Sequence, residues 1–189
     1  MRKSIMICLC ILLLTSMFVT GCNKKEENIQ KPMNTVKEER NENKEEKTID
    51  YVLFLRHKDK PFLFDEAYSI KANDEKLKGM SIEEFVMKEL IDFEGFGEYI
   101  NAIPKGTKLL SVKKDGETVI VDLSKEFVEG LKKNKEDTYL TLASIVNTLT
   151  ILPGNEKVQF MIEGEILDKI NDVDTSKPFE YIQGLYPDK

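Results

Sequence analysis

The residues that could carry acid–base or nucleophilic chemistry are few in this chain. The one histidine, His57, lies between Arg56 and Lys58. The segment 57–60, followed by Pro61, is typical of a turn. A lone histidine in such a place is predicted to be an exposed turn residue without a catalytic role.

Carboxylate pairs are numerous in this highly charged chain, and Asp122 with Glu126 is a candidate pair for general acid–base catalysis. Asp122, however, ends a predicted strand, where a carboxylate can accept hydrogen bonds from nearby backbone amides, and this structural role is favoured. Ser81 and Ser124 are interpreted as helix N-caps, because no Gly-x-Ser-x-Gly or Ser-x-x-Lys motif in a convincing context makes them nucleophiles. We therefore expect no catalytic residue and no enzymatic activity.

The sequence predicts neither a metal site nor a cofactor. No Cys-x-x-Cys, His-Glu-x-x-His or calcium-loop pattern occurs. The net charge is -6 and there is no basic stripe. Nucleic acid is therefore excluded as a partner, because its binding depends on neutralised phosphates. The same acidity argues against the folded domain lying on an anionic membrane.

The first 22 residues are typical of an N-terminal targeting signal. Arg2 and Lys3 form a basic start, and the apolar residues 5–19 are too short for a typical membrane-spanning helix. The sequence VTGC that ends at Cys22 resembles the lipobox of bacterial lipoproteins. This resemblance implies that residues 1–21 are removed and that Cys22 carries a diacylglycerol. The alternative is an ordinary secretory signal with a cysteine there by chance.

Cysteine usage agrees with a lipid anchor. Cys8 and Cys10 lie in the segment that would be removed, so the mature chain would keep only the acylated Cys22 and no disulfide. Two acyl chains such as palmitate suffice for stable anchoring, since each buried CH₂ contributes roughly 0.8 kcal/mol. The lipid bilayer is thus a predicted partner, at the extracytoplasmic face of the cell membrane.

Residues 22–48 predict a disordered, charged tether. They consist mainly of Asn, Lys and Glu, and such a composition cannot offset the entropy lost on ordering. A flexible chain of this length spans roughly 30 Å, which would hold a domain clear of the lipid. The alternative, a helix over residues 37–47, would have no apolar face with which to dock.

Residues 49–189 are long enough for one ordinary domain. Its clearest part is the stretch 103–127, in which period-2 alternation predicts a hairpin with a type I′ turn at Asp115-Gly116 and an N-cap at Ser124. The predicted strands are 51–55, 62–70, 109–112, 119–123 and 158–162. The predicted helices are 81–93, 124–131 (a short helix or turn) and one capped by Asp137 or Thr138 that runs to about 151. The tail 166–189 is expected to cross the surface, anchored by Phe179, Tyr181 and Leu185.

The element order predicts an α+β fold of the split β-α-β-β-α-β type, with an extra strand after the first. Its expected form is an antiparallel sheet with both helices on one face. Asn147, Thr148 and Thr150 are polar residues within an apolar helix. They are interpreted as hydrogen-bonding partners of an adjacent strand end, and the alternative is an edge that faces a ligand.

Several short motifs resemble the GerMN domain, the sporulation and spore germination domain. They are IPKGT (103–107), DG (115–116), VDLS (121–124), VNTLT (146–150) and the strand 158–164, with ELI (89–91) and SKPF (176–179) also similar. The resemblance implies a surface lipoprotein of Gram-positive bacteria with a role in sporulation or germination and no known catalysis. Some members have a related ring-building fold. The chain departs from the family in having length for one domain where the sporulation member has two, and DFEG at 92–95 where Gly-Pro is frequent.

Two hypotheses about function follow, together with a weaker third. The first is a non-catalytic interaction module that assembles with itself or with envelope proteins. The second is a protein that binds a small ligand or a cell-wall glycan, and the third is an envelope enzyme such as a wall hydrolase. An exposed sheet edge would favour the first, and a concave aromatic-lined site would favour the second. The absence of tryptophan weakens the second.

Overall fold

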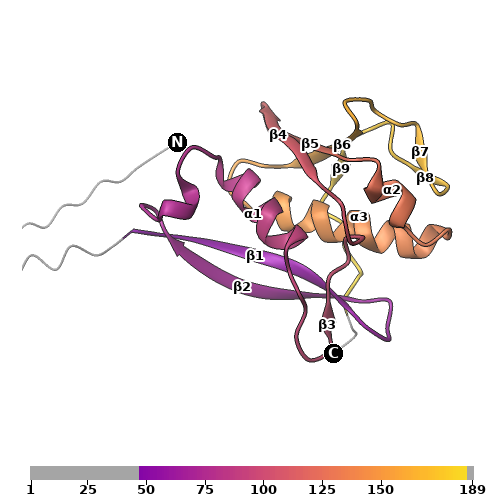
Figure 1. The fold of residues 1–189 in the computed structure, drawn as a ribbon, viewed down its shortest axis with the longest axis horizontal. Coiled ribbons are helices and arrows are strands. Elements are labelled where there is room, and N and C mark those ends of the chain that lie inside the picture. The colour runs from indigo at the N-terminus through magenta and orange to yellow at the C-terminus, as the bar shows by residue number, and fades with distance from the viewer. Residues whose placement is uncertain (1–46, 187–189) are drawn as a thin grey trace, which may run out of the picture. The chain divides into compact units, whose positions relative to one another are not determined.

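Two β-sheets enclose two helices in the computed structural model, which describes residues 47–186 (Figure 1). The predicted signal segment and nearly all of the predicted tether, Cys22 among them, lie outside the described residues. The elements are β1 (Thr48–His57), β2 (Leu63–Lys71), a 3₁₀ helix (Glu75–Leu77), α1 (Ile82–Ile91), β3 (Tyr99–Ile100), β4 (Leu109–Asp115), β5 (Thr118–Leu123), α2 (Glu126–Gly130), α3 (Lys135–Thr150), β6 (Lys157–Ile162), β7 (Lys169–Ile170), β8 (Val173–Asp174) and β9 (Phe179–Glu180).

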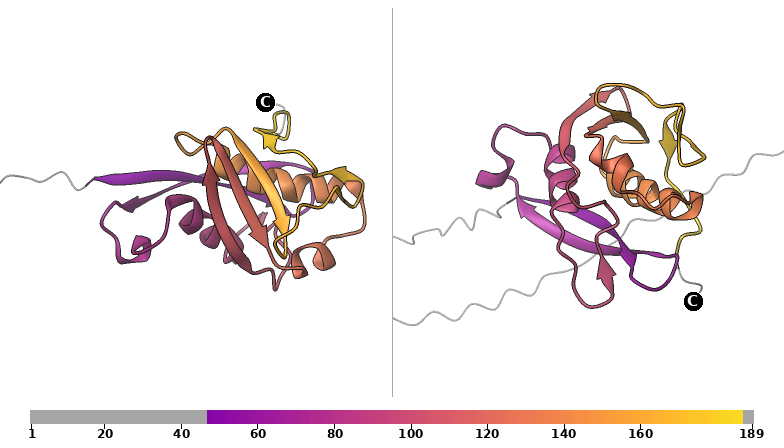
Figure 2. Two further views of the ribbon diagram at one scale, coloured as in Figure 1. Left: turned by 90° about the horizontal axis from the view of Figure 1, so that it is seen from above. Right: turned by 45° about the vertical axis from the view of Figure 1, so that its right-hand side comes forward.

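The layers place α3 at the centre of the domain. The sheet β2-β1-β3 lies on one side of α1 and α3, and the sheet β4-β5-β6-β9 lies on the other (Figures 1 and 2). Most residues of α3 are buried as a result, whereas a surface helix would bury one stripe. The α+β class predicted from the sequence is confirmed.

The arrangement of strands differs from the single antiparallel sheet expected. There are two main sheets and one small ladder, β7-β8, among the described residues, and β5 and β6 run parallel. They are parallel because α3 is the crossover between them, and a parallel pair needs such a connection. The helices therefore cover a face of each sheet in place of one face of one sheet.

The edge of β1 opposite β2 pairs with β3 only at Arg56 and His57, and at Phe54 it binds α3. Phe54 faces Asp65 on β2 across a pair whose backbone groups point outward. The N–H of Phe54 donates to Thr148 Oγ1 at 3.0 Å, and Ser144 Oγ donates to the carbonyl of Phe54. Two hydroxyl groups of α3, four residues apart, thus bind the backbone of Phe54 as a neighbouring strand would.

The hairpin β4–β5 is confirmed, with a corrected turn. Val119, Val121 and Leu123 of β5 are fully buried, as their alternation predicted. The two turn residues are Gly116 and Glu117, and only Gly116 has a positive φ, 58°. This is the pattern of a type II′ turn, so the predicted type I′ turn at Asp115-Gly116 is wrong by one residue and in type.

The predicted helix caps are confirmed at one of three positions. Ser81 Oγ accepts a hydrogen bond from the N–H of Glu84 at 3.1 Å and caps α1. Ser124 is not a cap, because its Oγ accepts from the N–H of Lys108 and closes the base of the hairpin. The helix α3 begins at Lys135, earlier than predicted, because Asn134 supplies the N-cap.

The C-terminal tail lies across the domain, as predicted, and contains three short strands. Phe179 in β9 packs against Phe160 with ring centroids 5.7 Å apart, and Tyr181 packs against Phe54. The carbonyl of Leu185 accepts a hydrogen bond from the N–H of Leu63 at 2.8 Å. Among residues 47–186, no helix is long and apolar enough to cross a membrane.

Candidate interaction surface

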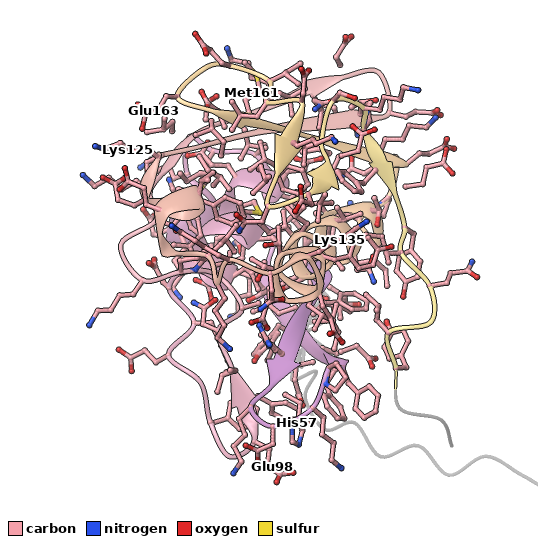
Figure 3. The ribbon with its side chains drawn as sticks, turned by 90° about the vertical axis from the view of Figure 1, so that its right-hand side faces the viewer. His57, Glu98, Lys125, Lys135, Met161 and Glu163 are labelled. Carbon is pink, nitrogen blue, oxygen red and sulfur yellow. The ribbon has the colours of Figure 1, made fainter. Side chains whose placement is uncertain are left out.

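His57 is buried at the end of β1, so the prediction that it is an exposed turn residue is wrong. Its side chain is 6% exposed, and its Nδ1 accepts from the N–H of Asp59 at 3.0 Å. Its Nε2 lies 3.4 Å from Glu98 Oε2, at the lower end of the molecule in Figure 3. These contacts fix the turn between β1 and β2, and they give His57 a structural role.

The two carboxylates of the candidate acid–base pair have separate partners. Asp122 Oδ1 accepts from the N–H of Gly164 at 3.0 Å, which confirms its predicted role at a strand end. A hydrogen bond with the Ser124 side chain, followed by one with its own backbone, lowers the pKa of Glu126. The nearby Glu163 accepts from the N–H of Lys125, and Figure 3 shows both at the end of the molecule away from His57.

Of the three polar residues of α3, only Thr148 bonds to a strand, as interpreted from the sequence, whereas Asn147 bonds to the C-terminal tail and Thr150 to its own helix. Asn147 binds the backbone of Ile182 in both directions, through Nδ2 at 2.9 Å and Oδ1 at 2.8 Å. Thr148 binds β1 as described above, and Thr150 Oγ1 donates to the carbonyl of Val146 at 2.8 Å. Asn147 and Thr148 are fully buried, so neither can contact a ligand.

A charged network at the start of α3 was missed from the sequence. Asp137 accepts hydrogen bonds from the Arg56 guanidinium and, at 3.1 Å, from Asn134 Nδ2, and Lys132 Nζ lies 3.2 Å away. Burial alone would raise the pKa of Asp137, but the bonds from Arg56, Asn134 and Lys132 outweigh it and lower the pKa. Arg56, a charge that follows the apolar run 51–55, was the available signal of a partner.

Two clefts open beside these elements. One, of about 570 Å³, lies beside the ion pair. Its lining is Arg56, Lys58, Asp59, Lys60, Pro61, Asn134, Lys135, Glu136, Asp137 and Leu140. The other, of about 650 Å³, extends from the end of α1 to Lys108 and has one aromatic residue, Phe93. Neither has the aromatic lining that the glycan-binding hypothesis requires.

Aromatic side chains gather instead on the loop around β3, which protrudes from the lower end of the fold in Figure 1. Phe93, Phe96, Tyr99 and Phe64 form a row with successive ring centroids 5.9, 5.1 and 5.3 Å apart. Phe96 is 51% exposed. Phe64 belongs to β2, and Phe93 also lines the second cleft. One aromatic residue in a cleft is not the concave, aromatic-lined site expected of a glycan-binding protein.

The outer strand β4 is protected against pairing with another strand. Its pairing with β5 is interrupted by an irregularity at Leu110, between Leu109 and Ser111. Lys113 and Lys114 follow on the same strand. Bulges and lysines are two of the means by which proteins prevent edge-to-edge association.

The outer strand β2 has no bulge, and its one lysine, Lys71, is its last residue. It pairs with β1 over nine consecutive residues without a shift in register, and it contains no proline. Since Asp65 faces Phe54, the backbone groups of Asp65, Ala67 and Ser69 point away from β1. The bond from Leu63 to Leu185 confirms this direction, and within residues 47–186 no backbone group outside the hairpin bonds to those three residues.

These observations describe, within residues 47–186, a small α+β domain in which the outer edge of β2 is open. The chain belongs to the Germane family, described as sporulation and spore germination, whose sequence profile matches residues 54–168. That match runs from β1 to beyond β6 and confirms the resemblance found in the sequence. No curated protein sequence matches the chain significantly.

Two solved structures of GerMN domains share this fold. The first GerMN domain of the sporulation protein GerM from Bacillus subtilis has 21% identity and a TM-score of 0.50, with 70% of this chain and 95% of that chain covered. The tandem GerMN domains of the same protein have 20% identity and a TM-score of 0.52, with 71% and 45% covered. A Clostridium perfringens protein described as a candidate lipoprotein has 25% identity and a TM-score of 0.47, with 70% and 87% covered.

Proposed function

We propose that this protein is a non-catalytic interaction module of the cell envelope that acts in sporulation or spore germination. Family membership supports the process. The observation that carries the interaction role is the open edge of β2, because a straight strand with unpaired backbone groups is a template for another strand. The proposed partners are envelope proteins or a second copy of the chain.

The proposal includes a lipid anchor at Cys22. The VTGC junction after the apolar segment supports it. The proposal keeps the predicted division into a signal of residues 1–21, a tether of 22–48 and a domain of 49–189. A short flexible tether raises the local concentration of a domain toward membrane partners to around millimolar, so that weak contacts suffice for assembly.

The anchor is tested by Cys22→Ala. We expect the variant to leave the membrane fraction or to remain unprocessed, because no other cysteine of the mature chain can accept the diacylglycerol. Mass spectrometry of the mature protein identifies its first residue and any acyl group. A mature N-terminus elsewhere, without acylation at Cys22, would contradict the proposal.

The interaction role is tested by comparing the two sheet edges in cells. Ala67→Lys introduces a lysine at the open edge, and Leu110→Lys places one on the edge that is already protected. Both residues are exposed, so each variant should unfold within about 0.5 kcal/mol of the wild type. We expect only Ala67→Lys to reduce recovery of partners from membranes and to impair sporulation or germination.

Two results would overturn this proposal. One is that both variants keep wild-type recovery and phenotype. The other is turnover of a cell-wall substrate by the purified protein that Asp122→Asn abolishes at unchanged melting temperature. Localising a tagged full-length chain through growth and sporulation separates a sporulation role from a general envelope role.

A further inference from the structure

We propose that the open edge of β2 binds β2 of a second copy of this chain, antiparallel and about a two-fold axis that passes through Ala67. The inference rests on the proposed interaction function and names its partner. The resulting sheet would be continuous across both copies, in the order β3-β1-β2-β2-β1-β3. Such an isologous contact closes on itself and forms a dimer.

The limits of the open stretch place the axis. At one end, the N–H of Leu63 is already bonded to the carbonyl of Leu185. At the other, the carbonyl of Lys71 accepts from the N–H of Asp74 at 2.9 Å. Between them, the outward backbone groups belong to Asp65, Ala67 and Ser69, and Ala67 is the midpoint.

Pairing about this midpoint uses the outward backbone groups of Asp65, Ala67 and Ser69. Ala67 lies opposite Ala67 of the second copy, and Asp65 lies opposite Ser69 in both directions. Each of these three pairs is of the hydrogen-bonded kind and exchanges two N–H···O bonds. The tail at Leu185 ends the ladder there, which limits it to this short stretch.

The side chains of β2 are complementary to themselves in this register. Asp65 meets the Ser69 hydroxyl of the other copy, and on the opposite face Glu66 meets Tyr68. No two like charges are directly opposite, which would be destabilising. Sliding one strand by four residues would instead place Asp65 opposite Asp65. Ala67 and Ser69 are exposed and small, so the two backbones can approach.

Such a short contact is expected to be weak in dilute solution, because six backbone hydrogen bonds bury little apolar surface. Membrane confinement compensates, since two anchored copies meet at a high local concentration. The contact is therefore studied in the full acylated chain, reconstituted in vesicles of phosphatidylcholine and phosphatidylglycerol.

The test places one cysteine at a time along the open edge. The variants are Asp65→Cys, Ala67→Cys and Ser69→Cys, all at exposed positions. Opposite residues of a hydrogen-bonded pair have Cα atoms about 5.5 Å apart, whereas Ser69 would lie about 14 Å from Ser69 of the other copy. A short bismaleimide should therefore link two copies of Ala67→Cys and neither of the other single variants.

Vesicles that contain two different cysteine variants provide a second test of the register. Asp65→Cys and Ser69→Cys should each remain monomeric when reconstituted separately and should form a linked dimer when mixed, because the two-fold axis places them opposite each other. Random collision in the membrane would link all three single variants alike. Melting curves at the wild-type temperature confirm that each variant is folded.

The outcomes separate this inference from the proposed function. Linked dimers of Asp65→Cys or Ser69→Cys as abundant as those of Ala67→Cys, or no linked dimer at all, would overturn self-pairing. If Ala67→Cys in native membranes were linked only to a protein of different mass, self-pairing would be wrong and the interaction function would stand. If no adduct formed and Ala67→Lys also had the wild-type phenotype, both would fail.

Discussion

The hairpins β1–β2 and β4–β5 are built on one plan but differ at both of their edges. In each, the inner strand is buried, with Leu55 and Leu123 fully inaccessible, and the outer strand borders solvent. The outer strand of the second hairpin is interrupted by a bulge and carries lysines, whereas that of the first is straight. The straight outer strand with open backbone groups is the one to which we assign the proposed contact.

The inner edges differ as well. The strand β5 is completed by six consecutive pairs with β6, so its backbone is satisfied by another backbone. The strand β1 is completed at Phe54 by hydroxyls of α3. The β1–β2 hairpin therefore depends on particular side chains of a distant segment, while β4–β5 depends mainly on regular pairing and burial.

The largest effects are expected from truncating the two inner strands. Leu55→Ala and Leu123→Ala should each lower the free energy of unfolding by about 2–5 kcal/mol, because each leaves a cavity in the core. Since α3 packs against both sheets, each variant should unfold in a single transition. Chemical denaturation and hydrogen exchange measure this. Selective exchange of the β1 amides in Leu55→Ala, with β5 amides as protected as in the wild type, would show two independent units.

The next largest loss of stability is expected from removing the hydrogen bond between the Thr148 side chain and the backbone of β1. Thr148→Val keeps the shape of the side chain but leaves the N–H of Phe54 unpaired in the interior, so it should cost about 1–3 kcal/mol. Thr150→Val is the matched control, because Thr150 donates only to its own helix. Denaturation should place the control within about 0.5 kcal/mol of the wild type. Equal losses in both variants would mean that the bond to Phe54 contributes nothing particular.

The sequence predicted the strands and helices that alternation and helical spacing define. The strand β5 alternates strictly, and Ser81 with Glu84 formed a capping box, so both were found. Predictions failed where a local signal had two solutions. Ser124 could cap a helix or bind the backbone of Lys108, and the fold uses the second. Asp137 or Thr138 was predicted to cap the long helix, but Asn134 supplies the cap, and the Asp137 side chain binds Arg56 of β1.

The layer arrangement could not be predicted from local patterns. Period 2 identifies a strand but does not say which edge it pairs with. That α3 would complete β1 depends on Ser144 and Thr148 meeting Phe54, a contact over some 90 residues of sequence. The open edge of β2 follows from the same arrangement, so it too was invisible before the fold. His57 was misjudged because Phe64 and Glu98, which cover it, come from other elements.

A smaller effect is expected at the turn of the second hairpin. A Cβ added at Gly116 would meet no atom within 4 Å, so Gly116→Val should cost only the backbone strain of a positive φ. For residues with a Cβ such strain is about 1–3 kcal/mol. Gly116→Asn is the control, because turns of the primed types accept asparagine more readily than a β-branched residue. Thermal melting should rank asparagine above valine, and equal melting temperatures would mean that the turn changes type without penalty.

The last and smallest effect at neutral pH is an acid sensitivity confined to the first hairpin. The pKa of Asp137 is lowered in the fold, so its stabilising contribution is complete above its ordinary value of 3.8 and is lost as the pH falls toward the lowered pKa. Protonation removes the partner of Arg56, which ties β1 to α3. The hairpin β4–β5 has a looser contact of this kind, with Lys114 Nζ 3.9 Å from Glu83.

As the pH is lowered from 5 into the acid range, the backbone amides of β1 and β2 should therefore be the first to lose their protection from hydrogen exchange. In Asp137→Asn this difference between the hairpins should no longer depend on pH, even though Glu126 and Asp174, whose pKa values are also lowered, still titrate. Uniform loss of protection in both hairpins of the wild type would mean that the ion pair does not set the acid stability of β1.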